Sequence, residues 1–375
     1  MGGVNGANIV SAEKSIVAAN NALANSTSGH GIMAEEAQTV IDKLWGRDAL
    51  VVGRTNIKDG ADRLVDGTYI QTKFYNSGKR CVDACFDKES GLYRYFDDKG
   101  NPMPVEVPKD MYDDAVSEFA KKISKGKVPG VTDSDAASDY VRSSDLTYEN
   151  AVNLCSPLTK ESLLYDCATG VVHCSFVFGI SGAAAFIIEY KRSKSVKRAL
   201  LAAIKTGVKV FGLSYVLYIL CSQFARTKLY WSLPNLFTGM GKESSGAEMV
   251  RAVNNSIKIG SGDVAASASA SLNQLSRFVK SSLLISLIVL LVFMVPEIYR
   301  FARGKITSGE FLHNIVLIVA SKLASTLLFI LTGAILATFV QSSAVAMVLC
   351  LIASCAGGYL GRKLIFVLEL KSEVE

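Results

Sequence analysis

Long apolar runs that appear only after residue 168 constrain this chain more than any other feature. Charged residues crowd the first 168 positions, whereas a later segment such as 281–299, "SSLLISLIVLLVFMVPEIY", is almost continuously apolar. A helix needs about 20 apolar residues to cross a bilayer. We therefore expect a soluble α+β domain followed by an α-helical transmembrane domain of four to five apolar helices.

The soluble part predicts a small domain over residues 31–168, preceded by a flexible leader, 1–30. Apolar residues at helical spacing predict a helix over 33–46 that stops at Gly46. Cys81 and Cys85 lack a second pair or a nearby His, so we expect reduced structural thiols rather than a zinc site. The other expected elements are strands at 49–53 and 68–75, a hairpin over 81–96, an edge strand at 105–107 between prolines, an amphipathic helix over 109–126 and two short helices within 128–155.

The membrane part predicts two groups of helices. Its candidate spans are 170–190, 199–221, 281–299, 315–340 and 342–361. These spans divide the rest of the chain into a first helical hairpin, 169–221, a polar linker or amphipathic region, 222–280, a second helix group, 281–363, and a C-terminal tail, 364–375.

The basic loops 191–198 and 300–305 do not give a consistent orientation. The positive-inside rule would place both in the cytoplasm, and the soluble domain would then lie outside. The first residues, however, show no signal that could export that domain. We expect the domain in the cytoplasm and the helices in a bacterial inner membrane, with the lipid bilayer as the first partner.

Polar residues within the apolar segments have two interpretations. Charges at the centre of a membrane helix are costly and often functional, but lysines near the interface can extend outward to water. Helix faces with small residues four apart, such as Gly179 and Ala183, also allow a homo-oligomer. The polar or gating candidates are Lys205, Lys209, Lys322, Glu189 and Glu297.

The stretch 60–75, "GADRLVDGTYIQTKFY", contains the sharpest chemical pattern. Gln71 and Lys73 lie two apart on an expected strand and therefore share one face. Asp62 and Asp66 lie just upstream, and a helix with Glu36 precedes them. An edge strand with a solvated polar face is the simpler interpretation.

This order resembles the PD-(D/E)xK nuclease fold, in the restriction-endonuclease-like branch whose strand motif is Q-x-K. The resemblance implies a divalent metal, Mg²⁺, held by Asp66 or Asp62 together with Gln71. It also implies that Lys73 is the catalytic cation and that Glu36 assists from the helix. Hard oxygen ligands suit Mg²⁺, and a nearby cation offsets developing phosphate charge.

A broader resemblance involves "ADRLVDGTYIQTKFY", "YRYFDDKGNPMPVEVPKDMYDDAV", "GKVPGVTD", "LTYENAVNL" and "FGIS". These segments are similar to a bacterial family of multi-pass inner-membrane proteins with a soluble N-terminal domain. The resemblance implies the location and the two-part build, and it supplies no activity.

Three functional hypotheses follow. The first is a membrane-anchored interaction or effector protein whose soluble domain senses or binds a protein partner, without independent catalysis. The second is a membrane-tethered Mg²⁺-dependent DNA endonuclease, restriction-like and active in phage defence. The third is a channel or pore-forming effector that uses the intramembrane lysines.

Overall fold

The computed structural model describes residues 29–53, 59–227, 289–336, 349, 352–354 and 356–365. The expected leader, most of the polar linker and most of the C-terminal tail lie outside the described residues. The chain divides into two compact units, Leu23–Tyr165 and a second unit that contains Asp166–Glu375, and each is treated by itself.

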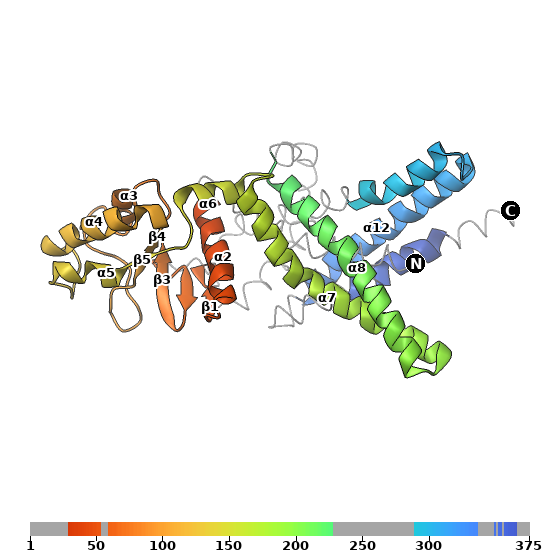
Figure 1. The fold of residues 1–375 in the computed structure, drawn as a ribbon, viewed down its shortest axis with the longest axis horizontal. Helices are drawn as coiled ribbons and strands as arrows, with labels where there is room; N and C mark the ends of the chain where they lie inside the picture. The colour runs from red at the N-terminus through yellow and green to blue at the C-terminus, as the bar shows by residue number, and fades with distance from the viewer. Residues whose placement is uncertain are drawn as a thin grey trace. The chain divides into compact units, whose positions relative to one another are not determined.

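The first unit is built on a five-stranded mixed sheet with strand order β1-β2-β3-β4-β5 (Figure 1). The first three strands form an antiparallel meander, and β3, β4 and β5 run parallel. Asp66 and Gly67 both have positive φ (48° and 79°), and they close the two-residue hairpin between β2 and β3. The strands are β1 Ala49–Val51, β2 Arg63–Val65, β3 Thr68–Thr72, β4 Val105–Val107 and β5 Val141–Ser143.

Helices of this unit contact different parts of the sheet. Helix α2, Gly29–Leu44, contacts β1 and β2 and also packs on α6, Tyr148–Cys155. Helix α4, Tyr112–Ser124, contacts β5 and the short helix α3, Gly78–Asp83. The remaining short helices are η2 Lys109–Met111, η3 Ser134–Ala136 and α5 Ala137–Tyr140.

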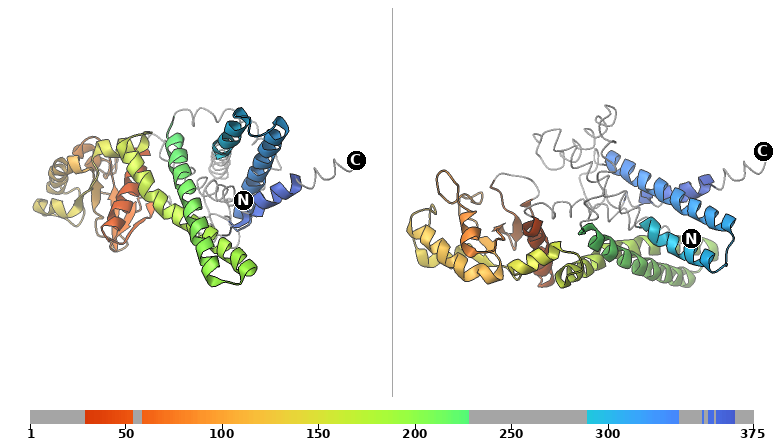
Figure 2. Two further views of the ribbon diagram at one scale, coloured as in Figure 1. Left: turned by 45° about the vertical axis from the view of Figure 1, so that its right-hand side comes forward. Right: turned by 90° about the horizontal axis from the view of Figure 1, so that it is seen from above.

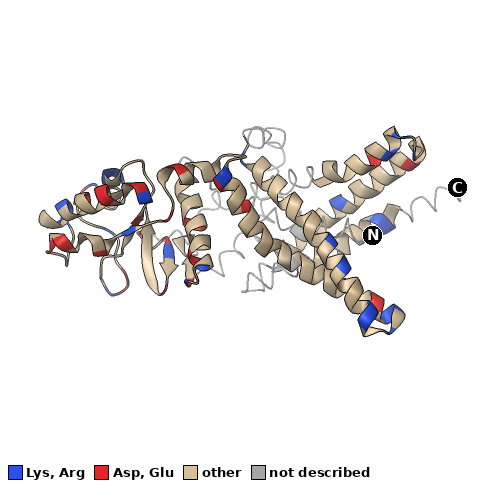
Figure 3. Cartoon of the chain, in the orientation of Figure 1, with Lys and Arg blue, Asp and Glu red and all other residues tan. Residues whose placement is uncertain are grey.

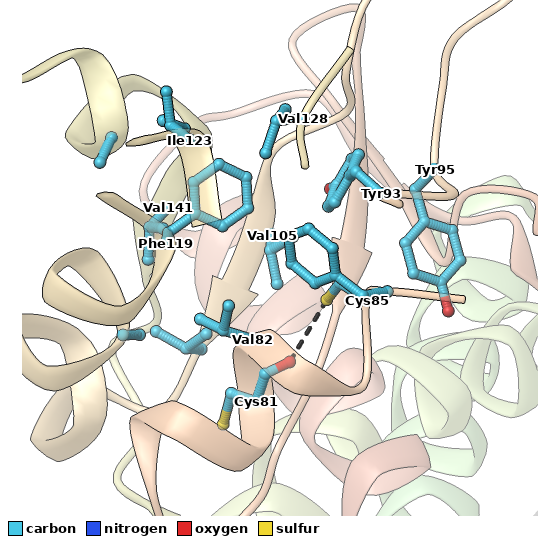
Figure 4. Packing of buried hydrophobic residues seen from close by; sticks show 14 of the residues in the cluster. Cys81, Val82, Cys85, Tyr93, Tyr95, Val105, Phe119, Ile123, Val128 and Val141 are labelled. Carbon is cyan, nitrogen blue, oxygen red and sulfur yellow. Dashed lines mark hydrogen bonds between the residues drawn. The ribbon is translucent and has the colours of Figure 1, made fainter. Parts of the chain in front are cut away.

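The two faces of the sheet differ in chemistry. Gln71 pairs in register with Val105, so both point to the face where Phe119 and Ile123 of α4 form the core (Figure 4). Thr72 pairs with Glu106, which points to the other face. There Arg63 is fully buried and binds Glu106, and it also binds Thr39 and Asp42 of α2.

Two expected elements of this unit are wrong. The hairpin over 81–96 is absent, because Ser77 caps a helix at this point by accepting from Arg80 N (3.2 Å) and α3 follows. Only an isolated bridge, Phe86 to Tyr93, remains. The strand 105–107 is not at an edge: β4 pairs on both sides, because the flanking prolines leave its three N–H groups free.

Two further differences concern length and number. β3 ends at Thr72 rather than at residue 75. The segment 128–155 does form α5 and α6, but Val141–Ser143 between them forms the additional strand β5.

The expected helix at 33–46 is confirmed as α2, and Gly46 follows it with φ +80°. The expected strand at 49–53 and the helix at 109–126 are confirmed as β1 and α4.

The second unit is helical. Three of its helices are long and apolar enough to cross a membrane: α7 Lys160–Ser193, α8 Val196–Ala225 and, within α12 Ser308–Leu336, the segment Ser308–Leu328. Residues 289–302 and 356–365 are also helical. The expected spans 281–299 and 342–361 lie partly outside the described residues.

Helices α7 and α8 form an antiparallel hairpin whose two helices run side by side in all views (Figures 1 and 2). A Cβ at Gly207 would lie 2.7 Å from the Phe178 ring, so the helices approach closely where glycine leaves room. Basic residues gather at the tip of the hairpin (Figure 3), where the expected loop 191–198 is largely helical and only residues 194 and 195 connect the helices.

At the other end of the hairpin lies a buried ion pair. Arg226 donates to the Asp166 carboxylate from both terminal guanidinium nitrogens, Nη1 at 2.7 Å and Nη2 at 2.9 Å. Gln223 Nε2 donates to the same carboxylate at 2.8 Å. The start of α7 is thereby fixed to the end of α8.

Candidate functional site

In the soluble unit, two side chains converge on one carboxylate oxygen of Asp62: those of Gln71 and Lys73. Oδ2 of Asp62 accepts hydrogen bonds from Gln71 Nε2 and from the backbone N–H of Thr72 (2.9 Å). Lys73 Nζ lies 3.5 Å from the same oxygen. The structure therefore brings together three of the residues that the Q-x-K resemblance predicts.

The hairpin explains this convergence. Asp62 directly precedes β2, and its N–H donates to the carbonyl of Ile70 on β3 (3.0 Å). Alternation along β3 then places Gln71 and Lys73 on one face and Ile70 on the other. Gln71, within β3, is 3% exposed, whereas the side chains of Lys73, just after β3, and of Asp62, just before β2, are 16% and 21% exposed.

Two oxygen atoms of these residues are the ones that a hard divalent cation would use. The Oε1 atom of Gln71 is buried and has no hydrogen-bond partner. The position that a Cβ of Gly53 would occupy lies 2.9 Å from the Asp62 Cα and 3.0 Å from its Oδ1, so a side chain at position 53 would crowd this oxygen. One carboxylate and one amide oxygen suit Mg²⁺, which keeps several waters and takes few protein ligands.

The ligand set is small. Within the described residues no group of three or more His, Cys, Asp or Glu side chains could hold a metal ion. Asp62 and Gln71 would hold the cation, and the remaining positions would be left to water and substrate oxygens.

Lys73 is held as a cation. Burial alone would lower the pKa of its ammonium group, but the nearby Asp62 carboxylate and the Tyr95 side chain raise the pKa, and the net shift is upward. Its Nζ lies 5.0 Å from the centre of the Tyr95 ring and donates to Thr72 O at 3.2 Å. A proton stays on this lysine at neutral pH, so it supplies positive charge rather than a base.

Two other predicted site residues are not part of this cluster. Asp66 lies in the β2–β3 turn, and its Oδ1 accepts from Asp48 N at 2.8 Å. At about 3.3 Å per residue, the turn and Gln71 are separated by roughly 10 Å of strand. Glu36 lies on α2, and the polar contacts described for Asp62, Gln71 and Lys73 do not include it.

The intramembrane candidates have different environments. Lys205 and Lys209 are exposed on α8. Lys322 of α12 is 5% exposed, and within the described part of the chain its Nζ has no hydrogen-bond partner. Glu297 pairs with Arg300 (3.1 Å) and accepts from Asn314 (2.8 Å). Glu189 is half-buried.

Sequence reasoning missed three buried charged residues and one aromatic residue. Asp166 and Arg226 escaped because the expected hairpin, 169–221, excluded both. Arg63 was not considered because charged residues on a short strand are ordinarily exposed. Tyr95 was assigned to a hairpin. Its place beside Lys73 could not be predicted, because the two residues are far apart in the sequence and meet only in the folded chain.

Comparisons with known proteins find similarity over one part of the chain. Residues 12–124 match the model of the YeeR C-terminal domain family. The inner membrane protein YeeR of Escherichia coli (strain K12) is 44% identical over 105 residues, which is 28% of this chain and 20% of the relative. The chain thus spans about a fifth of the length of this curated relative.

The family match covers the Asp62, Gln71 and Lys73 cluster and ends before α7. Neither the description of the family nor the name of the relative states an activity. No solved structure matches the chain. The chain therefore combines a region similar to the YeeR C-terminal domain family and to a bacterial inner-membrane protein with three helices that are long and apolar enough to span a membrane.

Proposed function

We propose that this chain is a membrane-anchored, Mg²⁺-dependent nuclease whose site is formed by Asp62, Gln71 and Lys73. The observation that supports this proposal is the convergence of Gln71 and Lys73 on Oδ2 of Asp62, with Oε1 of Gln71 buried and unpartnered beside it. The order helix, aspartate, Q-x-K strand resembles the restriction-endonuclease-like nucleases.

Each residue of the site has a distinct task. Asp62 and Gln71 present hard oxygens, and Thr72 N–H fixes the orientation of the carboxylate. A bound Mg²⁺ would polarise the phosphate and lower the pKa of a coordinated water. The Lys73 ammonium offsets the negative charge that develops on the phosphate oxygens. Because the Lys73 ammonium group is already in place, it does not have to reorient as this negative charge develops.

The proposed location is a bacterial inner membrane, with the soluble unit in the cytoplasm beside its DNA substrate. Three candidate spans and the similarity to an inner-membrane protein support the membrane location. The side that the soluble unit faces and a homo-oligomer formed through small-residue helix faces stay predictions.

Cleavage by the full-length chain in nanodiscs tests the proposal. The substrates are plasmid DNA, single-stranded DNA and RNA, each with Mg²⁺ or with EDTA. Asp62→Asn and Lys73→Met are each expected to lower the rate by roughly two orders of magnitude or more. Asp66→Asn is the matched control: it removes a nearby carboxylate while Asn tolerates the positive φ of the turn, so the rate should persist.

The nuclease function would be rejected if the parent chain cleaves none of these substrates while hydrogen exchange shows that its soluble unit is folded. The second candidate would then take precedence: a membrane-anchored binding protein without catalysis. The small ligand set favours this candidate, because one carboxylate and one amide are few ligands for a catalytic metal. A loss of activity in Asp66→Asn that equals the loss in Asp62→Asn would also reject the proposed site.

A further inference from the structure

We propose that Tyr95 is a positioning residue, which holds the Lys73 ammonium beside Asp62 through the face of its ring. This inference rests on the proposed function, because it assigns a role within the same site. Tyr95 lies outside the Q-x-K strand and is 4% exposed. Figure 4 shows its ring at the rim of the core, beside Cys85.

The geometry places the ammonium between two partners. On one side the Asp62 carboxylate lies 3.5 Å from Nζ, and on the other the centre of the Tyr95 ring lies 5.0 Å away. A cation within about 6 Å of a ring centroid is attracted by the negative face of the ring. The side chain of Lys73 is 16% exposed, so water screens these attractions only in part.

The ring itself is held from its other end. Arg94 Nη2 donates to the Tyr95 hydroxyl at 2.7 Å, and the same nitrogen donates to Ala84 O at 3.1 Å. Arg94 Nη1 lies 3.4 Å from Asp59 Oδ1. These contacts fix the ring plane, so Lys73 is confined by a rigid partner rather than by a mobile surface.

Such a partner matters because the other contacts of Lys73 Nζ are the Asp62 carboxylate at 3.5 Å and the carbonyl of the neighbouring Thr72 at 3.2 Å. A flexible lysine can leave an exposed aspartate at little cost, since such ion pairs contribute about 0–1 kcal/mol. The ring supplies an attraction that does not compete for the oxygens of Asp62. Tyr95 therefore leaves Asp62 available as a ligand while it keeps the cation within reach of the phosphate.

The test measures the reactivity of Lys73 as well as cleavage. The full-length chain in nanodiscs receives short pulses of an amine-acetylating reagent, and mass spectrometry gives the labelling rate of Lys73 relative to the exposed Lys79. Tyr95→Leu should raise this relative rate by roughly three- to tenfold, whereas Tyr95→Phe, which keeps the ring and loses only the hydroxyl, should raise it clearly less. The kcat of Tyr95→Leu should fall roughly tenfold or more with KM little changed.

Controls separate positioning from folding. Tyr93→Phe removes a different buried hydroxyl, which donates to Met103 O at 2.6 Å, and should leave the labelling of Lys73 unchanged. Arg94→Met is a second route, since it frees the Tyr95 ring without altering the core. An unchanged labelling rate in both Tyr95→Leu and Arg94→Met overturns the inference. Faster labelling with unchanged kcat in an active enzyme overturns it too. Absence of cleavage by the parent chain rejects the nuclease function alone, because the labelling rate still decides whether Tyr95 holds Lys73.

Discussion

Among single residues, the thiols of Cys81 and Cys85 are the clearest example of burial that controls chemistry. Both are free and fully buried in the core of the soluble unit, and Cys85 Sγ donates to Cys81 O at 3.3 Å (Figure 4). Burial raises the pKa of Cys81 to about 11 and that of Cys85 to about 12. These thiols stay protonated and are therefore poor nucleophiles and poor metal ligands near neutral pH.

The raised pKa values predict a loss of stability in alkali. Because the folded-state pKa lies above the unfolded value of 9.0, the stabilisation is complete below pH 9 and is lost as the pH rises toward 11–12. Each pH unit above 9 should cost up to about 1.4 kcal/mol per thiol. Thermal unfolding of the full-length chain between pH 8 and 11 measures this slope, and Cys81→Ala/Cys85→Ala should flatten it. Equal slopes in the two proteins would contradict the assignment to the thiols.

The pair Asp62 and Asp66 shows what residue-level prediction can and cannot do. The sequence predicted that one of the two would join Gln71 and Lys73, and spacing alone could not choose between them. The choice depends on the turn: Asp66-Gly67 takes positive φ and closes the hairpin, which leaves Asp62 opposite the end of β3. Tyr95 could not be predicted, because it reaches Lys73 from a segment more than 20 residues later in the chain.

At the scale of elements, Arg63 joins α2, β2 and β4. Its guanidinium binds Asp42 and Glu106, and all three side chains are fully buried. Burial raises the pKa of Glu106, although the Arg63 charge opposes this rise. Arg142 of β5 lies 3.5 Å from Glu106 and 3.7 Å from Asp42, so the network extends to a fourth element.

Removal of this central charge should be costly. Arg63→Met leaves two buried carboxylates without their main partner and should lower the free energy of unfolding of the soluble unit by about 3–5 kcal/mol. Hydrogen exchange of the β2 and β4 amides in the full-length chain measures the change. Arg47→Met is the matched control: Arg47 binds the same Asp42 at 2.7 Å but is 44% exposed, so the loss should be about 0–1 kcal/mol. Comparable losses in the two variants would contradict this account.

Element prediction succeeded where a pattern was long and failed where it was short. The amphipathic helix α4 follows from the spacing of Phe119 and Ile123. β5 has three residues, too few for an alternating pattern to be recognised. β4 was predicted at an edge because prolines at 102, 104 and 108 surround it, yet its own three residues lack proline and pair on both sides.

For the whole molecule, Lys322 is the residue at which stability and function can be separated. Its Nζ is buried without a hydrogen-bond partner in the described part of the helical unit. A charge in such a position is costly, so Lys322→Leu should raise the free energy of unfolding by roughly 1–3 kcal/mol. The melting temperature in detergent should rise accordingly. Lys209→Leu, at an exposed position of α8, is the control and should change little.

A lower melting temperature of Lys322→Leu would mean that the ammonium has a stabilising partner. Dye leakage from liposomes tests the pore hypothesis with the same variant. Leakage that depends on Lys322 would favour a conduction role, and tight liposomes would count against it. The two-part build was predictable from the apolar runs, whereas the environment of Lys322 depends on how separate helices pack and could not be predicted.

The buried ion pair between Asp166 and Arg226 has a consequence for biosynthesis. Either residue alone would carry an unpaired charge at the end of its helix into the translocation machinery, whereas the two together are neutral and hydrogen-bonded. Insertion scales give about 2.5–3.5 kcal/mol for such a charge at a helix centre, and the cost is smaller toward a helix end, where these two residues lie. We therefore expect the α7–α8 hairpin to enter lipid more readily as a finished pair, after Arg226 has left the ribosome, than one helix at a time.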